Sequence, residues 1–343
     1  MVASPRLWIL SGGRKGDLDQ MVTLARATGW TFDVKQLSFA GPGIPILAPL
    51  LLEKRKTSLQ PPWPDVLLCA EASTSMIARE IKKKSAGATR IVCIGRPAGS
   101  AAAFDLVITT AQYRVPAAAN VVELSLPLSA APLAARQDMS ETAPIVLVVG
   151  GPAFPDRLDS ATAQRLAGDA LAHAAAQGRS LAVLTSPRTP REVADIFRRN
   201  IAPPHSLHVF GEGENRYTAL LGEAAEIIVT SDSVSMVADA LANGRPVSVY
   251  RLPQVHSLKW RLGEWLHHHA IERRSRLFTP VGKLFDAGVI EAAADRRLLF
   301  ARLRSEGRLG WFGDIDRPRA RPAGQSDFET ALESLRALMA GGA

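Results

Sequence analysis

Cysteine is scarce in this chain, whose 343 residues include only Cys69 and Cys93. Both stand in short apolar runs, which is typical of buried thiols. This usage excludes a disulfide-stapled secreted scaffold and favours a reducing, cytoplasmic setting. Aromatic residues are also few, at 6% of the chain. Because no RNA-binding signature accompanies them, nucleic acid is the least favoured partner.

Long hydrophobic runs are missing as well. No apolar stretch approaches the ~20 residues that a membrane-spanning helix needs. The first apolar run, residues 7–10, is followed at once by Gly12-Gly13, which does not fit a signal peptide. Neither a Walker pattern nor G-x-G-x-x-G is present, so the usual nucleotide fingerprints are absent. The net charge of +8 nevertheless favours an anionic partner, such as a nucleotide or an acidic lipid surface.

What the chain does contain is an alternation of short apolar runs and helical patterns. This alternation predicts parallel sheets with helices on both faces. An Ala- and Pro-rich stretch, residues 127–144, interrupts it and is predicted to be a linker. The strands expected before and after the linker are residues 7–10, 32–37, 65–69, 90–95, 105–109 and 121–124, then 145–149, 180–185, 208–210, 227–230 and 247–250.

The predicted fold is therefore α/β, with two Rossmann-like, doubly wound domains facing a cleft. Residues 1–138 are expected to form the first domain and residues 139–322 the second. Residues 323–343 contain an amphipathic helix that is expected to cross back and pack on the first domain. Ligands of open α/β sheets bind at the carboxyl ends of the strands, so we expect the functional residues in the loops there.

The segment 226–250 carries the strongest candidate site. A β-branched strand is followed by Ser231, Asp232 and Ser233, and then by a helix through Val234, Ser235, Met236 and Asp239. A helix start has free backbone N–H groups and a partial positive charge, so it attracts phosphate. The small hydroxyl side chains would let an anion come close. The same residues would also serve as an ordinary helix cap.

Two further loops of the second domain add polar groups. Arg188 could form a charge-assisted fork with phosphate oxygens, with Ser186 donating to the same group, although the loop could equally be a solvated one beside Thr189. Gly151 follows the strand 145–149, and Phe210-Gly211 could offer an aromatic face and backbone groups to a nucleotide base.

The first loop of the chain holds Gly12, Gly13, Arg14 and Asp17. Glycine allows close approach of a ligand, and a loop carboxylate such as Asp17 can act as a general base. The alternative is that Asp17 or Asp19 caps the next helix.

A separate segment, residues 44–56, places apolar residues before Lys54-Arg55-Lys56. It could dock on an anionic membrane surface, or it could be a core loop with a solvated basic end.

Residues 229–236 read VTSDSVSM, and Asp239-Ala240, Gly244 and Pro246-Val247 follow. This pattern resembles the mitochondrial-fission "elongated mitochondria" family, whose bacterial members are described as glycosyltransferase-like. That family resembles GT-B enzymes, which implies a nucleotide sugar in the second domain and the acceptor in the first. The resemblance implies that Asp239 holds the ribose in place of a longer acid. It also implies that Asp17 stands where relatives have His, and that Pro187 replaces one arginine of Ser-Arg-Arg-Thr-Pro.

The leading hypothesis is a metal-independent GT-B-type glycosyltransferase that uses a nucleotide-diphosphate sugar, without a further cofactor. The acceptor is expected to be lipid-linked or part of the cell envelope, and the protein to be cytoplasmic or peripheral on the inner face of the membrane. The alternatives are a nucleotide-sugar epimerase or hydrolase and a non-catalytic, nucleotide-sugar-binding adaptor. The predicted catalytic residues are Asp17 and Arg188, and the predicted substrate-binding residues are Gly12, Gly13, Arg14, Gly151, Ser186, Thr189, Phe210, Gly211, Ser231, Asp232, Ser233, Val234, Ser235, Met236 and Asp239.

Overall fold

The computed structural model describes residues 4–40, 45–53, 59–70, 72–128, 140–273, 275–290, 294–314 and 327–341. The chain forms two compact units. The first unit comprises Met1–Ala130, Leu258–Leu299 and Gln325–Ala343, and the second comprises Ala131–Ser257 and Phe300–Gly324. Residues 129–139, which are most of the predicted linker, lie outside the described residues. The basic cluster at residues 54–56 lies outside them as well.

The first unit is built on a parallel sheet that has six strands within the described ranges, in the order β2-β1-β3-β4-β5-β6. Its core strands are apolar and β-branched, as expected for strands covered on both faces. The strands are β1 (Arg6–Ser11), β2 (Thr31–Gln36), β3 (Val66–Cys69), β4 (Arg90–Ile94), β5 (Leu106–Thr110) and β6 (Val121–Leu124). Cys69 and Cys93 are buried on neighbouring strands, so their predicted burial is confirmed.

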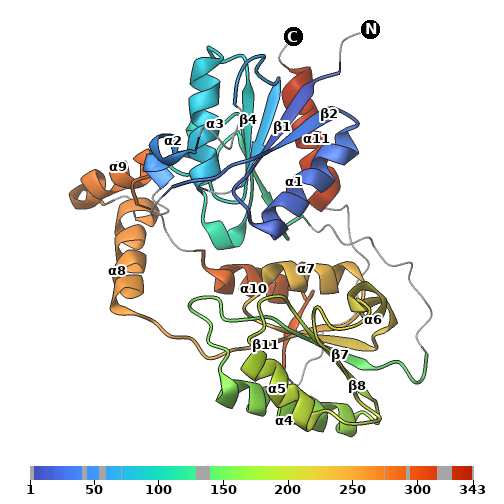
Figure 1. The fold of residues 1–343 in the computed structure, drawn as a ribbon. Helices are drawn as coiled ribbons and strands as arrows, with labels where there is room; N and C mark the ends of the chain where they lie inside the picture. The colour runs from blue at the N-terminus through green and yellow to red at the C-terminus, as the bar shows by residue number, and fades with distance from the viewer. Residues whose placement is uncertain are drawn as a thin grey trace. The chain divides into compact units, whose positions relative to one another are not determined.

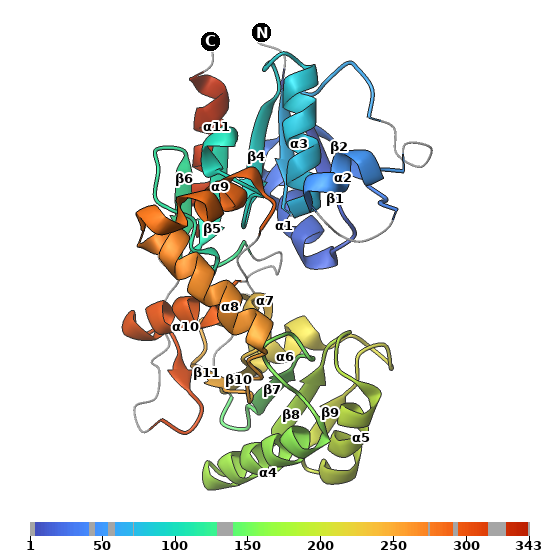
Figure 2. The same ribbon diagram turned by 90° about the vertical axis from the view of Figure 1, so that its left-hand side faces the viewer.

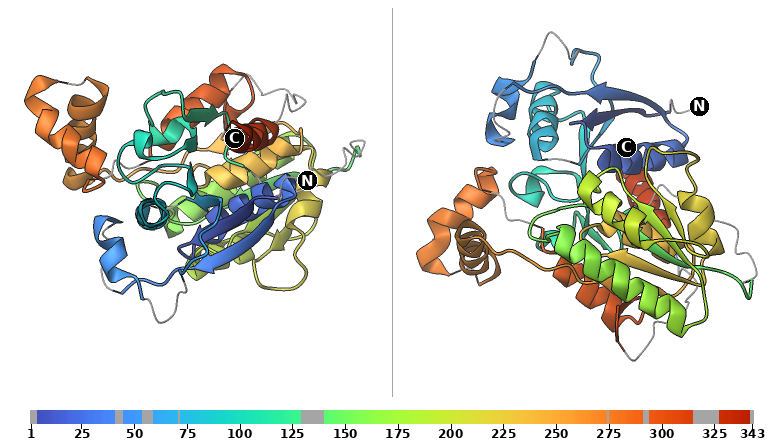
Figure 3. Two further views of the ribbon diagram at one scale, coloured as in Figure 1. Left: turned by 90° about the horizontal axis from the view of Figure 1, so that it is seen from above. Right: turned by 60° about the horizontal axis from the view of Figure 1, so that its bottom comes forward.

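Helices cover both faces of this sheet (Figure 1). On one face, α1 (Lys15–Thr28) and α11 (Asp327–Ala340) bury Leu24 and Leu335 in one apolar cluster. The dark red α11 runs close to the N-terminal, blue part of the unit in Figure 3. On the other face, α3 (Ala72–Lys84) packs Ile77 and Ile81 beside the short η1 (Pro45–Leu47) and α2 (Ala48–Leu51). Short turns η2 (Ala101–Ala103) and η3 (Ala111–Tyr113) follow β4 and β5.

The second unit repeats the design with a parallel sheet whose described strands number six, in the order β12-β11-β10-β7-β8-β9. Helices α4 and α5 bury Leu166 and Phe197 on one face, while α7 lies against β10 and β11 on the other (Figure 1). The strands are β7 (Ile145–Val149), β8 (Leu181–Thr185), β9 (Ser206–His208), β10 (Glu226–Thr230), β11 (Val247–Tyr250) and β12 (Gly310–Trp311). The helices are α4 (Ser160–Ala176), α5 (Arg191–Asn200), α6 (Tyr217–Glu223) and α7 (Val234–Ala242). Helix α10 (Arg296–Ser305) begins in the first unit and continues into the second.

The segment after β11 returns to the first unit, whereas the predicted division kept it in the second domain. It forms α8 (Leu258–His267), η4 (His268–Glu272), η5 (Arg276–Phe278) and α9 (Thr279–Ala287), drawn in orange in Figure 2. The reason is ionic: the half-buried Arg114, after β5, donates to Glu264 at 2.7 Å and to Asp295 at 3.3 Å. The backbone N–H of Ser100 also donates to the carbonyl oxygen of Asp286 at 2.9 Å.

The predicted fold class is confirmed: the chain contains two Rossmann-like, doubly wound α/β domains, and the last helix packs on the first. Within the described ranges, no helix combines the length and the apolar character needed to cross a membrane.

Candidate functional site

The centre of the candidate site is the place where the second sheet changes its winding direction. From β7 the chain winds outward through β8 and β9, and then crosses back to β10 on the other side of β7. Ligands of open α/β sheets bind outside the carboxyl ends of the strands at such a switch point. Gly150-Gly151 follows β7 there, and Ser231-Asp232-Ser233 follows β10. Both belong to the segments singled out in the sequence.

The Gly150-Gly151 pair permits close packing at this point. A Cβ atom on Gly150 would lie 2.0 Å from Oδ2 of Asp232, and one on Gly151 would lie 2.1 Å from the carbonyl oxygen of Arg188. Real Cβ atoms do not come this close to other heavy atoms, so a larger residue at either position must displace its neighbours. The β7 loop can therefore meet the β8 and β10 loops only because both residues lack side chains.

Asp232 joins the three loops through its fully buried carboxylate. It accepts hydrogen bonds from the Gly151 N–H at 2.9 Å, the Thr230 hydroxyl at 2.6 Å and the Arg188 guanidinium at 2.9 Å. Burial raises the pKa of Asp232, although all three donors act in the opposite direction. The Arg188 side chain remains 45% exposed beyond this ion pair. One side of the guanidinium can thus hold Asp232 while the other meets a ligand.

The start of α7 presents backbone rather than side chains. Ser233 occupies the N-cap position without a side-chain cap, so the first turn keeps its free N–H groups. Ser231, Asp232, Ser233, Val234 and Met236 are buried, and Ser235 is exposed. The Ser231 hydroxyl accepts from the backbone N–H of Leu252 at 3.0 Å and so serves the fold. An anion here would meet the N–H groups of the first turn and the Ser235 hydroxyl.

The β8 loop is held in shape by its own hydroxyl groups. The Thr189 hydroxyl donates to the carbonyl oxygen of Gly150 at 2.6 Å and accepts from the N–H of Ser186 at 2.9 Å. The Ser186 hydroxyl accepts from the N–H of Arg188 at 3.2 Å. These contacts fix the backbone from which the Arg188 side chain extends.

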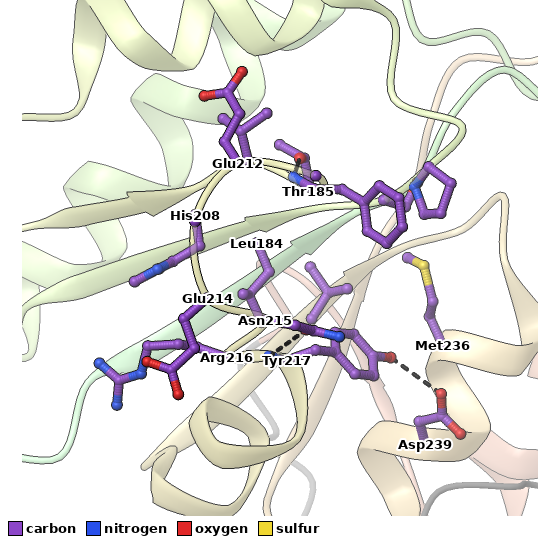
Figure 4. Close-up of a pocket in the computed structure, with 17 residues that line it drawn as sticks. Leu184, Thr185, His208, Glu212, Glu214, Asn215, Arg216, Tyr217, Met236 and Asp239 are labelled. Atoms are coloured by element: carbon purple, nitrogen blue, oxygen red, sulfur yellow. Dashed lines mark hydrogen bonds between the residues drawn. The ribbon is translucent and has the colours of Figure 1, made fainter.

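A pocket of about 450 Å³ opens beside the start of α7 (Figure 4). Its size suits a small ligand. Predicted site residues in its lining are Ser186, Phe210, Gly211, Met236 and Asp239. Met236 and Asp239 reach it from α7, and Tyr217 from the start of α6. Phe210 is 54% exposed, which leaves its ring available to a ligand.

Tyr217, which together with Phe210 was a candidate to pack on a nucleotide base, also belongs to the site although the predicted substrate-binding set did not include it. Its hydroxyl donates to Oδ2 of Asp239 at 3.1 Å, drawn as a dashed line in Figure 4. Burial, and then the Asp239 carboxylate, raise the pKa of Tyr217 far above its ordinary value. The phenol therefore stays protonated and orients the carboxylate that was assigned to the ribose. The Asn215-Arg216-Tyr217 turn in the sequence was the available signal.

The remaining predicted residues lie in the first unit, where β1 ends beside β3 at that sheet's own change of direction. Gly12 and Gly13 follow β1, and Arg14 is the N-cap residue of α1. Asp17 stands in the first turn of α1. Burial, and then the charge of Asp17, raise the pKa of Tyr113 to about 12. Asp17 and the half-buried phenol of Tyr113, after β5, therefore share one edge of the first sheet.

Comparison with known proteins gives a family match over most of the chain. A family model described as Mitochondrial fission ELM1 matches residues 15–291. A curated relative, Mitochondrial fission protein ELM1 of Arabidopsis thaliana, is 27% identical over 124 residues. These residues are 36% of this chain and 28% of the relative, so the match spans less than a third of the relative's length.

Two solved structures are also similar to the chain. The UDP-GlcNAc 2-epimerase from Methanocaldococcus jannaschii is similar at a TM-score of 0.49 and 10% identity, over 98% of this chain and 100% of that chain. MurG of Acinetobacter baumannii is similar at a TM-score of 0.46 and 12% identity, over 97% of this chain and 99% of that chain.

Proposed function

The chain belongs to the Mitochondrial fission ELM1 family, as the motif at residues 229–247 predicted, and we propose that it is a metal-independent GT-B-type glycosyltransferase that uses a nucleotide-diphosphate sugar. The observation that carries the proposal is the arrangement at the switch point of the second sheet. There the open first turn of α7, a half-exposed Arg188 and an aromatic pocket with a fixed carboxylate lie together. These are groups suited to a diphosphate, a base and a ribose.

Each part of the donor has a proposed partner in the second unit. The diphosphate binds to the N–H groups at the start of α7 and to the exposed side of Arg188. The base enters the pocket against Phe210 and Met236, and the ribose hydroxyls meet Asp239, which Tyr217 holds in place. Tyr217 is thus a positioning residue, since its hydroxyl acts through Asp239.

The proposed reaction places a base in the first unit. The acceptor hydroxyl loses its proton to Asp17, and its oxygen attacks the anomeric carbon of the sugar. The bond from that carbon to the diphosphate breaks, and its electron pair remains on the diphosphate oxygen. The start of α7 and Arg188 stabilise the charge that grows on this leaving group.

The acceptor is proposed to be lipid-linked or part of the cell envelope, with the protein peripheral on a membrane. Support comes from the segment 45–53, in which the Leu50 side chain is 82% exposed. An exposed leucine beside a basic sequence is suited to an anionic membrane surface.

Thermal unfolding with UDP-, GDP-, ADP- and CMP-sugars tests donor binding directly. A ligand at about 100 times its Kd adds about 2.7 kcal/mol to the free energy of unfolding, so one diphosphate sugar should raise Tm clearly. CMP-sugars carry a single phosphate and should not. Arg188→Lys keeps a positive charge opposite Asp232 but loses the guanidinium fork, and should weaken donor binding about tenfold. Arg199→Ala, an exposed change on α5, is the matched control.

Product analysis then separates the alternatives. Epimerised or free sugar in the absence of an acceptor would indicate an epimerase or a hydrolase. A rise in Tm without any turnover would indicate a nucleotide-sugar-binding adaptor. If none of the nucleotide sugars raises Tm, the proposed donor site is wrong.

A further inference from the structure

The first unit contains a cavity of its own, with a volume of about 620 Å³. Its lining comes from the loops that follow β4 and β5 and from the arm formed by η4, η5 and α9. Figure 2 shows this arm in orange. Every residue of its lining belongs to the first unit. The proposed donor site is in the second unit, so this cavity is separate from it.

The wall of the cavity is closely built rather than a loose gap between elements. A Cβ atom on Gly99 would lie 2.5 Å from the carbonyl oxygen of Asp286, and one on Gly288 would lie 3.2 Å from the nitrogen of Gly99. Both glycines have positive φ, +86° for Gly99 and +78° for Gly288. The end of α9 thus meets the β4 loop at a distance that only glycine permits.

The lining combines charged and apolar side chains. Arg96, after β4, and Lys283, on α9, bring positive charge, and Asp286 is the one acid among the described lining residues. Arg114 also lines the cavity, but Glu264, Asp295 and Glu272 neutralise it. Lys283 is exposed, and no ion pair joins it to another residue of the described ranges.

Other side chains of the lining are apolar. Ala270 and Phe285 are almost completely buried and form a small cluster with Ile271 and its neighbours. Ala270, Ile271 and Phe285 also line the cavity, together with Val115 from the β5 loop. The volume falls within the range of ~300–1,000 Å³ that is usual for small-molecule sites.

We propose that this cavity binds an amphipathic anion, with a phosphate or carboxylate at Arg96 and Lys283 and a hydrocarbon chain along Ala270, Ile271 and Phe285. Each half of the ligand meets matching chemistry, since charge-assisted hydrogen bonds hold the anion and the apolar wall removes the chain from water. The ligand can be a free lipid phosphate or a lipid of an anionic bilayer. The proposal does not depend on sugar transfer.

Calorimetric titration with decyl phosphate, kept below its micelle concentration, tests the site. Decyl phosphate should bind at least tenfold more tightly than decanol or inorganic phosphate, because each of these lacks one half of the ligand. Ala117→Trp, an exposed substitution in the lining, should weaken binding tenfold or more by filling the space. Ala119→Trp lies in the same exposed loop but outside the lining, and should bind as the wild type does.

A second pair of variants tests the charge. Lys283→Ala should weaken binding of decyl phosphate about three- to fivefold and leave binding of decanol unchanged, as expected for an exposed ion pair. Lys83→Ala on α3 is the matched control. Tm of each variant shows that it remains folded.

Vesicles that contain phosphatidic acid identify the source of the ligand: they displace decyl phosphate if a bilayer lipid enters the cavity, and they fail to do so if the ligand is a free molecule. Equal binding by Ala117→Trp and Ala119→Trp, or equal affinity of the wild type for decyl phosphate and decanol, would overturn the proposal.

Discussion

Two adjacent glycines determine how closely the loops of the second unit surround the Asp232 carboxylate. Gly150 and Gly151 leave no side chain between β7 and the loops that carry Arg188 and Asp232. The Asp232 carboxylate then accepts hydrogen bonds from Thr230, Gly151 and Arg188 at the same time. The position of Arg188 therefore depends on residues that carry no functional group of their own.

Gly151→Ala should lower the free energy of unfolding by about 1–3 kcal/mol, because its Cβ would overlap the backbone of Arg188. It should also weaken donor binding, since Arg188 must move. The control is Gly168→Ala in the exposed part of α4, where the new Cβ would have no atom within 4 Å. That change should stabilise the protein by about 0.8–1 kcal/mol, because alanine favours a helix interior. Urea unfolding measures the change in the free energy of unfolding for each variant. If both variants change it in the same direction, the steric explanation is wrong.

The sequence was informative about the start of α7 because capping residues and apolar periodicity are local signals. The structure places Ser233 at the N-cap and Val234 at the first helical position, close to the prediction. The inward orientation of Asp232 was not predictable, because its partner Gly151 is 81 residues away in the chain and becomes a neighbour only when β7 pairs with β10. The hydrogen bond from Tyr217 to Asp239 was hidden for the same reason.

At the scale of secondary-structure elements, α8 is attached to the first unit by a buried polar group. His267 is completely buried, and its Nδ1 lies 3.4 Å from a guanidinium nitrogen of Arg114. Its Nε2 has no hydrogen-bond partner among the described residues. Burial, and then the charges of Arg96 and Arg114, lower the pKa of His267 to about 4. The imidazole is therefore neutral in the folded protein at neutral pH.

The buried imidazole should make stability depend on pH. The pKa of His267 is near 6.5 in the unfolded chain and about 4 in the folded one, so the unfolded state binds the proton first. The contribution of the neutral His267 imidazole to the free energy of unfolding is complete above pH 6.5 and is lost as the pH falls towards 4. Between pH 7 and pH 5, we expect a loss of about 2 kcal/mol. Urea unfolding of the wild type and of His267→Gln at pH 7 and at pH 5 measures how much of the loss comes from His267. If both proteins lose the same free energy of unfolding, His267 is not the cause.

Helices α8 and α9 belong to the first unit, although the predicted division placed them in the second domain. Their helical character is a local property of the mostly helical sequence between residues 258 and 308. Their attachment to the first unit is not local, because it depends on Arg114, whose partner Glu264 is 150 residues away. The strand predicted at residues 208–210 likewise forms two residues earlier, as β9 at Ser206–His208, since pairing with β8 fixes its register.

At the scale of the whole molecule, α11 completes the first unit from the far end of the sequence. Asp327 accepts hydrogen bonds from the N–H groups of Ser125 at 2.8 Å and Leu126 at 3.0 Å. Ala331 and Leu335 are fully buried against the same sheet. The predicted crossing of the last helix to the first domain rested on its apolar face, and the sequence could not identify Ser125 and Leu126 as its partners.

Asp327→Ala should destabilise the first unit by about 1–2 kcal/mol, because two backbone N–H groups lose their acceptor. Hydrogen-exchange mass spectrometry should then show roughly five- to thirtyfold faster exchange in β5 and β6. Peptides from β7 and β8 should exchange at the wild-type rate if the two units unfold separately. Glu333→Ala, an exposed change on the same helix, is the control. Equal acceleration in both units would mean that they unfold together.

The division of the first unit among separate chain segments has a consequence for synthesis on the ribosome. Strands β1 to β6 and helix α1 emerge first, yet the part of the sheet beside β5 and β6 that α11 covers, around Ile108, stays uncovered until α11 has been made. The whole second unit is translated in between. During that interval the nascent chain exposes an apolar surface that chaperones recognise, so translation speed through residues 131–324 sets how long the growing protein depends on them.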